Sequence, residues 1–359
     1  MGYIDEIIGR YKSLRSIREL SHKYTQQYAL VGLGSHCANN LLPVIQYLKL
    51  PLKYICCTSE KKAELISQKY KGVKGTTSLQ DILNDDTVSG VFVAAHPHSH
   101  FHIATEVIKA GKSLFIEKPP CENERELKSL TNTIKLYGSQ NIVVGLQRRF
   151  APATQILQKR LKGDGKRHYH YRYLTGLYPE GDAMLDLFIH PLDYVTFLFG
   201  KTKVKAAEEM RSKDGGQTLF LVLEHQNITG MLELSTDYSW QNPQEQLSIS
   251  TDKGQYILDR MERLDFSPRH SAIWGIPLEK VFQNNATVVN LYGRNGFVPI
   301  VGNNQIVSQG FFSEIQAFAD VVENRCKDNH AFGLESVKHV YSLMAEIKKY
   351  MNIIDDHIL

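Results

Sequence analysis

Short apolar runs alternate with longer amphipathic stretches over the first part of the chain. The apolar runs have the length of buried strands and lie at 28–32, 52–57, 90–95, 113–116 and 142–145. Helical spacing of apolar residues separates most of them, at 41–48, 61–70, 102–110 and 122–136. Strands and helices in alternation predict a parallel sheet with crossover helices, so we expect an α/β domain here.

The pattern changes after about residue 150. Strand-like segments flank short polar turns in pairs, which is typical of antiparallel hairpins, at 218–223 with 229–234 and at 247–250 with 255–258. Basic residues alternate with tyrosines over 168–173, which predicts a strand with His168, His170 and Arg172 on one face. That face either lines a sugar pocket or is one side of a half-buried sheet. Helical patterns follow at 310–324 and 334–350. We therefore expect an α+β domain with a large, mainly antiparallel sheet.

The N-terminal segment has its own periodicity. Apolar residues recur every three or four positions from Ile4 to Leu20, which predicts an amphipathic helix within an extension spanning 1–27. Such a helix packs either on its own chain or on a partner subunit. The boundaries that follow are 28–150 for the α/β domain and 151–359 for the second domain.

Composition narrows the class of protein. The chain has 359 residues, 42% hydrophobic and 22% charged, as expected for two globular domains. The net charge of +4 arises from 42 basic and 38 acidic residues spread along the sequence, so we expect no nucleic-acid-binding face. No apolar run approaches the roughly 20 residues of a membrane span, and Asp5 and Glu6 interrupt any signal-like segment. We expect a cytoplasmic protein without membrane contact, and the five cysteines lack the spacing of a zinc site.

A glycine-containing turn joins the first predicted strand to the first helix. Glycines at such a turn let the backbone approach a pyrophosphate, and the helix N-terminus supplies N–H donors. Cys37 takes the place of a third glycine and is small enough for close packing. This indicates a Rossmann dinucleotide-binding domain, with an ordinary turn as the alternative. The predicted cofactor contacts are Gly32, Gly34, Ser35, His36 and Cys37.

The end of the second strand bears on the type of cofactor. NAD enzymes commonly place an acidic residue there to bind the ribose 2′-hydroxyl. This chain has Thr58, Ser59 and Lys62 instead, which would bind a 2′-phosphate without carboxylate repulsion. We expect NADP as the preferred cofactor and NAD as the alternative, unless the lysine belongs to a solvated helix face.

Two further motifs carry candidate chemistry. Lys118 directly follows the strand at 113–116, and ligands of open parallel sheets bind beyond the carboxyl ends of strands. Asp186 and His190 are four residues apart, so a helix would place both on one face, with Asp193 three residues later. A histidine can move a proton to or from a hydroxyl while a carboxylate orients its ring. A surface lysine and a set of capping or core residues are the alternatives.

Taken together, these motifs resemble those of the Gfo/Idh/MocA family, which includes glucose-fructose oxidoreductases and inositol dehydrogenases. The resemblance extends from Tyr28 to the end of the chain. The matching segments are Gly32-x-Gly34, Leu42-Pro43, Ala94 to His100, Glu117-Lys118-Pro119, Gly145-x-Gln147-x-Arg149-Phe150-x-Pro152 and Asp186-x-x-x-His190-x-x-Asp193.

The resemblance implies an NAD(P)-dependent oxidoreductase that acts on a hydroxyl or carbonyl carbon of a sugar, a sugar derivative or a cyclitol. It makes Lys118, Asp186 and His190 the catalytic residues. The matching segments add predicted cofactor contacts at Ala95, His96, His100, Glu117, Lys118 and Gln147. The predicted substrate contacts are Lys118, Arg149, Tyr178, Asp186 and His190, of which Tyr178 is chosen for its closeness to the catalytic helix.

Three alternatives or extensions stay open at this point. Some relatives of this fold bind NAD(P) as non-catalytic sensors, so a regulatory protein is the alternative function. Histidines at every second position from His96 to His102 could bind zinc or nickel if that segment were extended. We predict no metal there, because the segment leaves a strand for a helix. Similar proteins pair through the C-terminal sheet, which implies a homodimer or a homotetramer.

Overall fold

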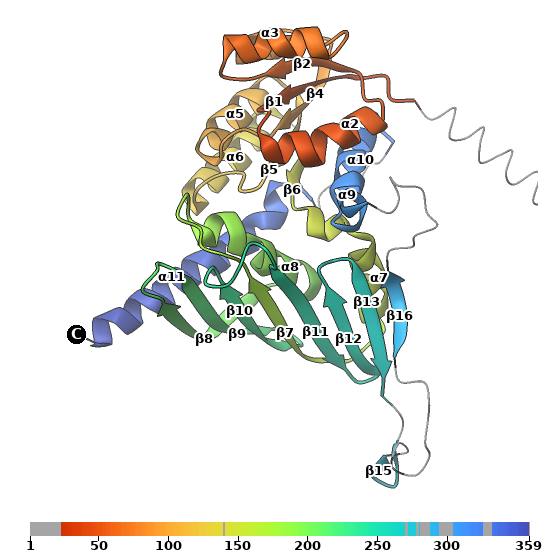
Figure 1. The fold of residues 1–359 in the computed structure, drawn as a ribbon, viewed down its shortest axis with the longest axis vertical. Helices are drawn as coiled ribbons and strands as arrows, with labels where there is room; N and C mark the ends of the chain where they lie inside the picture. The colour runs from red at the N-terminus through yellow and green to blue at the C-terminus, as the bar shows by residue number, and fades with distance from the viewer. Residues whose placement is uncertain are drawn as a thin grey trace, which may run out of the picture.

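A computed structural model describes residues 23–138, 141–269, 272–277, 280, 288–293, 304–325 and 332–358 (Figure 1). The predicted N-terminal helix and Cys326 lie outside these residues. Within them, six parallel strands form one sheet and a second, eight-stranded sheet lies beside it. The predicted combination of a Rossmann-type domain with a mainly antiparallel sheet is therefore confirmed. No helix in the described ranges combines the length and the apolar character that a bilayer span requires.

The first sheet has the strand order β3-β2-β1-β4-β5-β6. Its strands are β1 Gln27–Val31, β2 Leu52–Cys56, β3 Lys74–Thr76, β4 Val88–Val93, β5 Ser113–Glu117 and β6 Ile142–Gly145. The helices between them are α2 Leu42–Tyr47, α3 Glu60–Lys69, α4 Leu79–Leu83, α5 Pro97–Lys109 and α6 Glu124–Tyr137. The order reverses between β1 and β4, which is where open α/β sheets bind their ligands.

Alternate residues of the central strands fill two separate cores, one on each face of this sheet. Ala29 and Val91 belong to one core, whereas Tyr28 and Phe92 belong to the other. The second core is completed from far along the chain by α10 Phe311–Val322, which α9 Gln305–Ser308 precedes. The Phe318 ring lies 4.9 Å from that of Phe92 in a T-shaped contact. The C-terminal part of the chain therefore helps to support the first sheet.

The second sheet has the order β16-β13-β12-β11-β7-β10-β9-β8, and β7 with β10 is its parallel pair among the described strands. Its strands are β7 Lys166–Leu174, β8 Thr202–Arg211, β9 Gln217–His225, β10 Thr229–Ser235, β11 Gln244–Thr251, β12 Gly254–Asp259, β13 Arg263–Pro268 and β16 Val289–Gly293. One face is covered by α7 Pro152–Leu161, α8 Ile189–Phe199 and α11 Lys338–Ile358 (Figure 1). Both predicted hairpins are present, β9 with β10 and β11 with β12. Alternation in β7 is also as predicted, because Tyr169, Tyr171 and Tyr173 are buried and His168 is exposed. A small hairpin of β14 Ala272–Ile273 and β15 Ile276–Pro277 lies apart from both sheets.

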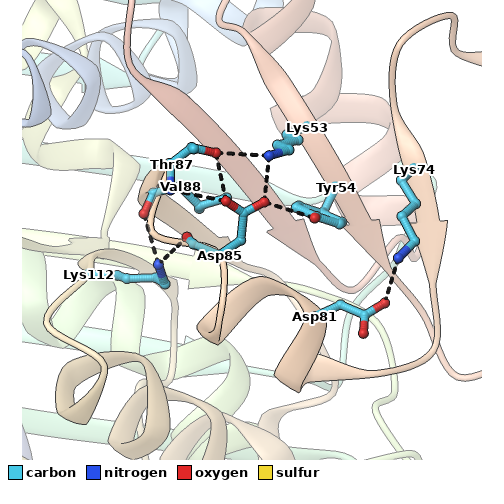
Figure 2. Close-up of polar contacts among 8 residues, drawn as sticks. All are labelled: Lys53, Tyr54, Lys74, Asp81, Asp85, Thr87, Val88 and Lys112. Carbon is cyan, nitrogen blue, oxygen red and sulfur yellow. Dashed lines mark hydrogen bonds and ion pairs between the residues drawn. The ribbon is translucent and has the colours of Figure 1, made fainter.

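A polar network holds the amino end of β4, at the edge opposite the strand ends that carry the candidate site (Figure 2). Lys112 is buried, and its Nζ donates to the carbonyl oxygens of Asp85 at 2.8 Å and Val88 at 3.0 Å. The Asp85 carboxylate accepts from Tyr54 at 2.8 Å and pairs with Lys53 at 2.6 Å. Hydrogen bonds from Lys53, Thr87 and Tyr54 lower the pKa of Asp85. Because these donors hold the connection between β3 and β4 in place, we assign this cluster a role in the stability of the fold.

Candidate functional site

A cavity of about 620 Å³ lies at the carboxyl ends of β1, β2 and β4. Cavities of this size commonly hold small ligands and cofactors. Nine of the predicted cofactor contacts line it, namely Gly32, Gly34, Ser35, His36, Cys37, Thr58, Lys62, Ala95 and His96. The other five, Ser59, His100, Glu117, Lys118 and Gln147, are not among the lining residues.

The glycine turn has the geometry that a dinucleotide needs. Gly32 has a φ of +91°, and a Cβ added there would lie 2.5 Å from the carbonyl oxygen of Ala94. A Cβ added at Gly34 would meet nothing within 4 Å, so this glycine borders open space. The chain then enters a π-helical turn, η1 Cys37–Leu41, which leads into α2, within the predicted helical stretch 41–48. The backbone at Gly34 therefore borders the cavity without obstruction.

The far end of the cavity carries hydroxyl and ammonium groups. Ser59 caps α3 by accepting from the amide of Lys62 at 3.4 Å. The Lys62 ammonium donates across the cavity to the carbonyl oxygen of Leu33. None of the described residues that line the cavity is acidic. The cavity therefore has no carboxylate that would repel a phosphate group.

Glu117 connects the glycine turn to the loop that carries Lys118. It is buried at the end of β5, and its Oε1 lies 3.2 Å from Nε2 of His36. Its Oε2 accepts from the Lys118 amide at 3.2 Å. The Glu117 carboxylate thus contacts both His36 and the Lys118 amide. These contacts indicate that Glu117 supports the cleft rather than contacting the cofactor directly.

His100 joins the loops that follow β4 and β5. The ring is buried, with Nδ1 2.7 Å from the Pro119 oxygen and Nε2 3.0 Å from the Ala95 oxygen. Burial lowers the pKa of His100, although both carbonyl contacts oppose that effect. The extended arrangement considered for His96 to His102 is wrong, because α5 begins at Pro97 and turns successive side chains around a helix. Within the described residues, no group of three histidine, cysteine or acidic side chains could hold a metal ion.

Lys118 contacts the segment that contains Asp186 and His190, the second predicted motif. Its Nζ donates to the carbonyl oxygen of Asp186 at 2.6 Å. Burial lowers the pKa of Lys118, the charges of Glu117 and Asp186 raise it, and that of Arg148 lowers it further. The structure therefore brings Lys118 and Asp186, which are far apart in the sequence, to one place.

The candidate catalytic helix starts with a π-helical turn, η3 Met184–Phe188, and continues as α8. Asp186 lies in this wider turn, where its Oδ2 accepts from the Tyr178 hydroxyl at 3.3 Å. Burial and the neighbouring Asp186 charge raise the pKa of Tyr178 to about 12. π-Helical turns are frequent at functional sites, and η3 contains Asp186, one of the predicted catalytic residues.

His190 is buried at the start of α8 and is 8% exposed. Burial lowers its pKa well below the ordinary value, and electrostatic interactions with Arg148, Lys118 and His36 lower it further. Of these groups, Lys118 follows β5 and His36 follows β1 of the first sheet, whereas Arg148 belongs to the 147–150 segment. The imidazole is therefore neutral near pH 7 and able to accept a proton.

The two arginines of the 147–150 segment have different environments. Arg149 is fully buried; its guanidinium donates to Asp193, with the Nε bond at 2.9 Å, and to Ser336 Oγ at 2.7 Å. Both it and Asp193 therefore lie in the interior, whereas they were predicted as a substrate contact and as part of the catalytic face. Gln147 is likewise buried.

Arg148 is the residue that the sequence did not single out. Its Nε and Nη2 donate to the two oxygens of Glu245, each at 2.7 Å, and its Nη1 is a buried donor without a hydrogen bond in the described structure. Its charge lowers the pKa of both His190 and Lys118. The sequence motif contains two adjacent arginines, which marks the segment as unusual. Only their ion pairs in the structure, Arg148 with Glu245 and Arg149 with Asp193, show that the two residues differ.

Comparison with known proteins places this geometry in context. Residues 26–145 match the Gfo/Idh/MocA group described as an oxidoreductase family with an NAD-binding Rossmann fold. A putative oxidoreductase, YceM, of Salmonella typhimurium is 24% identical over 242 residues, which cover 66% of this chain and 77% of that protein. The inositol 2-dehydrogenase/D-chiro-inositol 3-dehydrogenase of Lactiplantibacillus plantarum is 23% identical over 186 residues, covering 48% of this chain and 52% of the relative.

Similarity of fold extends over nearly the whole chain. The crystal structure of a dehydrogenase from Chromobacterium violaceum superposes with a TM-score of 0.77 at 16% identity, covering 92% of this chain and 98% of that one. In sequence, however, the match to the inositol dehydrogenase spans only about half of the relative's length. The family model itself matches residues 26–145, which form the first sheet.

Proposed function

The chain belongs to the Gfo/Idh/MocA family of oxidoreductases, and on this basis we propose that it transfers a hydride between a nicotinamide cofactor and a hydroxyl or carbonyl carbon. The hydrogen bond from Lys118 Nζ to the Asp186 carbonyl carries the proposal, because it joins the cleft of the first sheet to the helix of His190. Sugars, sugar derivatives and cyclitols are the proposed substrates, in keeping with an inositol dehydrogenase among the relatives. The division at residue 150 and a cytoplasmic location stay predictions.

The side chains of the site have distinct proposed roles. A bound nicotinamide would accept or supply the hydride. His190, neutral near pH 7, takes the proton of the substrate hydroxyl during oxidation, and its protonated form supplies that proton to the substrate oxygen during reduction. The Lys118 ammonium stabilises negative charge on the same oxygen. Asp186, which accepts from Tyr178, holds the substrate end of the site.

We propose NADP as the preferred cofactor, with Lys62 and Thr58 as its phosphate contacts. Lys62→Ala should weaken NADPH binding about tenfold and NADH binding less than about twofold, because a charge-assisted hydrogen bond to the extra phosphate is lost. Dissociation constants from the quenching of intrinsic fluorescence give this ratio. Lys61→Ala, on the same helix but outside the cavity lining, should change neither. Equal weakening of both cofactors by Lys62→Ala would show that Lys62 supports only the glycine turn.

We also propose that the protein self-associates through the open face of the second sheet. A row of side chains crosses this face in register, through Ala206, Val222, Met231, His170, Ser248 and Ile257. Met231 is 54% exposed near the middle of the row, which no described helix covers. Large apolar groups on such a face are typical of protein interfaces.

Met231→Glu should reduce the mass in solution from that of a dimer or tetramer to that of a smaller species, because the charge would be buried at the interface. Sedimentation velocity at micromolar concentration measures this change. Leu136→Glu, on the exposed side of α6, is the matched control and should leave the mass unchanged. A wild-type protein that sediments as a monomer would contradict the proposal.

A further inference from the structure

Trp240 contacts the loop that carries Tyr178. Its Nε1 donates to the carbonyl oxygen of Leu177 at 2.8 Å, directly before Tyr178 in the chain. The two segments meet because β7 and β10 lie side by side and run parallel, so both chains leave the second sheet at the same edge (Figure 1). The Trp240 side chain is 52% exposed, so burial in the core does not account for its position.

Two glycines let this loop, residues 175–182, approach its neighbours closely. A Cβ added at Gly176 would lie 2.4 Å from Cδ1 of Trp240. A Cβ added at Gly181 would lie 2.4 Å from Oδ2 of Asp186 and 3.0 Å from the ring of Tyr178. The 175–182 loop is therefore packed against Trp240 near its start and against Asp186 near its end.

Hydrogen bonds fix both ends of the 175–182 loop. At its start, the amide of Thr175 donates to the carbonyl oxygen of Ser235 at 2.8 Å. At its end, the carboxylate of Asp182 accepts from the amide of Met184 at 2.8 Å. The bond from Trp240 holds the backbone between these two points, so it bears directly on where the middle of the loop lies.

The middle of the loop carries the Tyr178 hydroxyl to the candidate site. That hydroxyl donates to Oδ2 of Asp186 at 3.3 Å, and Nζ of Lys118 donates to the carbonyl oxygen of the same residue at 2.6 Å. Burial and the Asp186 charge raise the pKa of Tyr178 to about 12, so the hydroxyl keeps its proton near pH 7. Contacts therefore connect the exposed Trp240, through the loop, to Asp186.

We propose that Trp240 is a positioning residue that keeps the Tyr178 hydroxyl against Asp186. The bond to the Leu177 carbonyl does this, because it fixes the backbone next to Tyr178. The hydroxyl and the carboxylate then present a donor and an acceptor, already in place, to a hydroxyl group of the substrate. Groups that are held in their binding geometry gain affinity, because less motion is lost when the substrate binds. The effect on substrate rests on the proposed oxidoreductase function, whereas the effect on Tyr178 does not.

Nuclear magnetic resonance of the full chain, labelled with ¹³C at Cζ of tyrosine, tests the contact without substrate. The Tyr178 signal is the one missing from Tyr178→Phe, and Asp186→Asn shows its position once the acceptor has lost its charge. Trp240→Phe keeps an aromatic ring but has no N–H donor, so it should move the Tyr178 signal toward that position. Trp274→Phe changes the other tryptophan of the chain, which is 97% exposed, and should not move it. An unmoved signal in Trp240→Phe would overturn the proposal.

Steady-state rates test the effect on substrate. With a keto sugar or keto-cyclitol that the wild type reduces, Trp240→Phe should raise KM about tenfold and change kcat less than about twofold, because only binding is weakened. Trp274→Phe should change neither constant. A tryptophan that served only the fold would lower Tm and leave KM unchanged, and this result would contradict the proposal.

Two further outcomes are separated by design. If the wild type reduces none of the compounds tested, the oxidoreductase proposal fails, and the Tyr178 signal alone decides the role of Trp240. If Trp240→Phe does not fold, Gly176→Ala takes its place, because the added Cβ pushes the loop away from an intact Trp240. It should move the Tyr178 signal in the same direction, and an unmoved signal would again overturn the proposal.

Discussion

Lys118→Met is expected to reduce turnover by about 10³-fold, the size of effect found when one donor that stabilises an oxyanion is removed. Methionine keeps the length and much of the volume of the side chain but cannot donate a hydrogen bond. NADPH affinity should stay within about threefold of the wild type, because Lys118 does not line the cavity at the glycine turn. Steady-state rates and a fluorescence titration of NADPH measure the two quantities separately.

The matched control is Lys128→Met, which makes the same change at an exposed lysine of α6. It should alter neither turnover nor binding. If Lys118→Met turned over substrate at the wild-type rate, Lys118 would not act on the reacting oxygen. Its hydrogen bond to Asp186 would then serve only to hold the two parts of the cleft together.

His190→Asn is expected to reduce turnover by about 10²- to 10⁴-fold, the usual contribution of a general acid–base residue. It should also change the pH profile. Burial lowers the pKa of His190, and electrostatic interactions with Arg148, Lys118 and His36 add to that effect, so the ring gains a proton only below its ordinary range. In the wild type, the rate of hydroxyl oxidation should therefore be flat near pH 7 and fall on the acid side of about pH 6.5. His190→Asn should lose this acid limb.

The same shift affects stability, with a defined sign. An unfolded chain binds a proton at this histidine below about pH 6.5, whereas the folded protein does not, so the contribution of His190 to stability falls with decreasing pH. His225→Asn is a useful control, because His225 is also a buried histidine with a lowered pKa, bonded to Tyr169 and Gly200. It should reduce thermal stability and leave the acid limb of the rate profile in place. An acid limb that survived in His190→Asn would assign the proton transfer to another group.

Much of the first sheet could be predicted because its strands are buried on both faces and their sequences are continuously apolar. Each predicted strand at 28–32, 52–57, 90–95, 113–116 and 142–145 overlaps one of β1, β2, β4, β5 and β6. The π-helical turns at Cys37–Leu41 and Met184–Phe188 were not predicted, since a local pattern cannot distinguish one wider turn from a regular helix. The short strand β3 also lacks an apolar run of its own.

Contacts between segments that are far apart in the sequence were the main features that the hydrophobic pattern could not predict. Nothing local shows that α10 covers the first sheet, or that Arg148 rather than Arg149 lies near His190. A weak signal for Glu314 does exist, because it shares a helical stripe with Phe311, Ile315 and Phe318, all of them buried. An acidic residue in an apolar stripe indicates a buried charge or a functional group, and Glu314 is fully buried in the structure.

The most direct test of the account is the oxidation of NADPH by a panel of keto sugars and keto-cyclitols, followed by the loss of NADPH absorbance. The central claim is that Lys118 and His190 act on one substrate oxygen beside the cofactor. It predicts that at least one carbonyl compound is reduced by the wild type, while Lys118→Met binds NADPH but consumes it at a negligible rate. Tight binding of NADPH by the wild type, with no consumption across the panel, would contradict the claim and favour a cofactor-sensing regulatory protein.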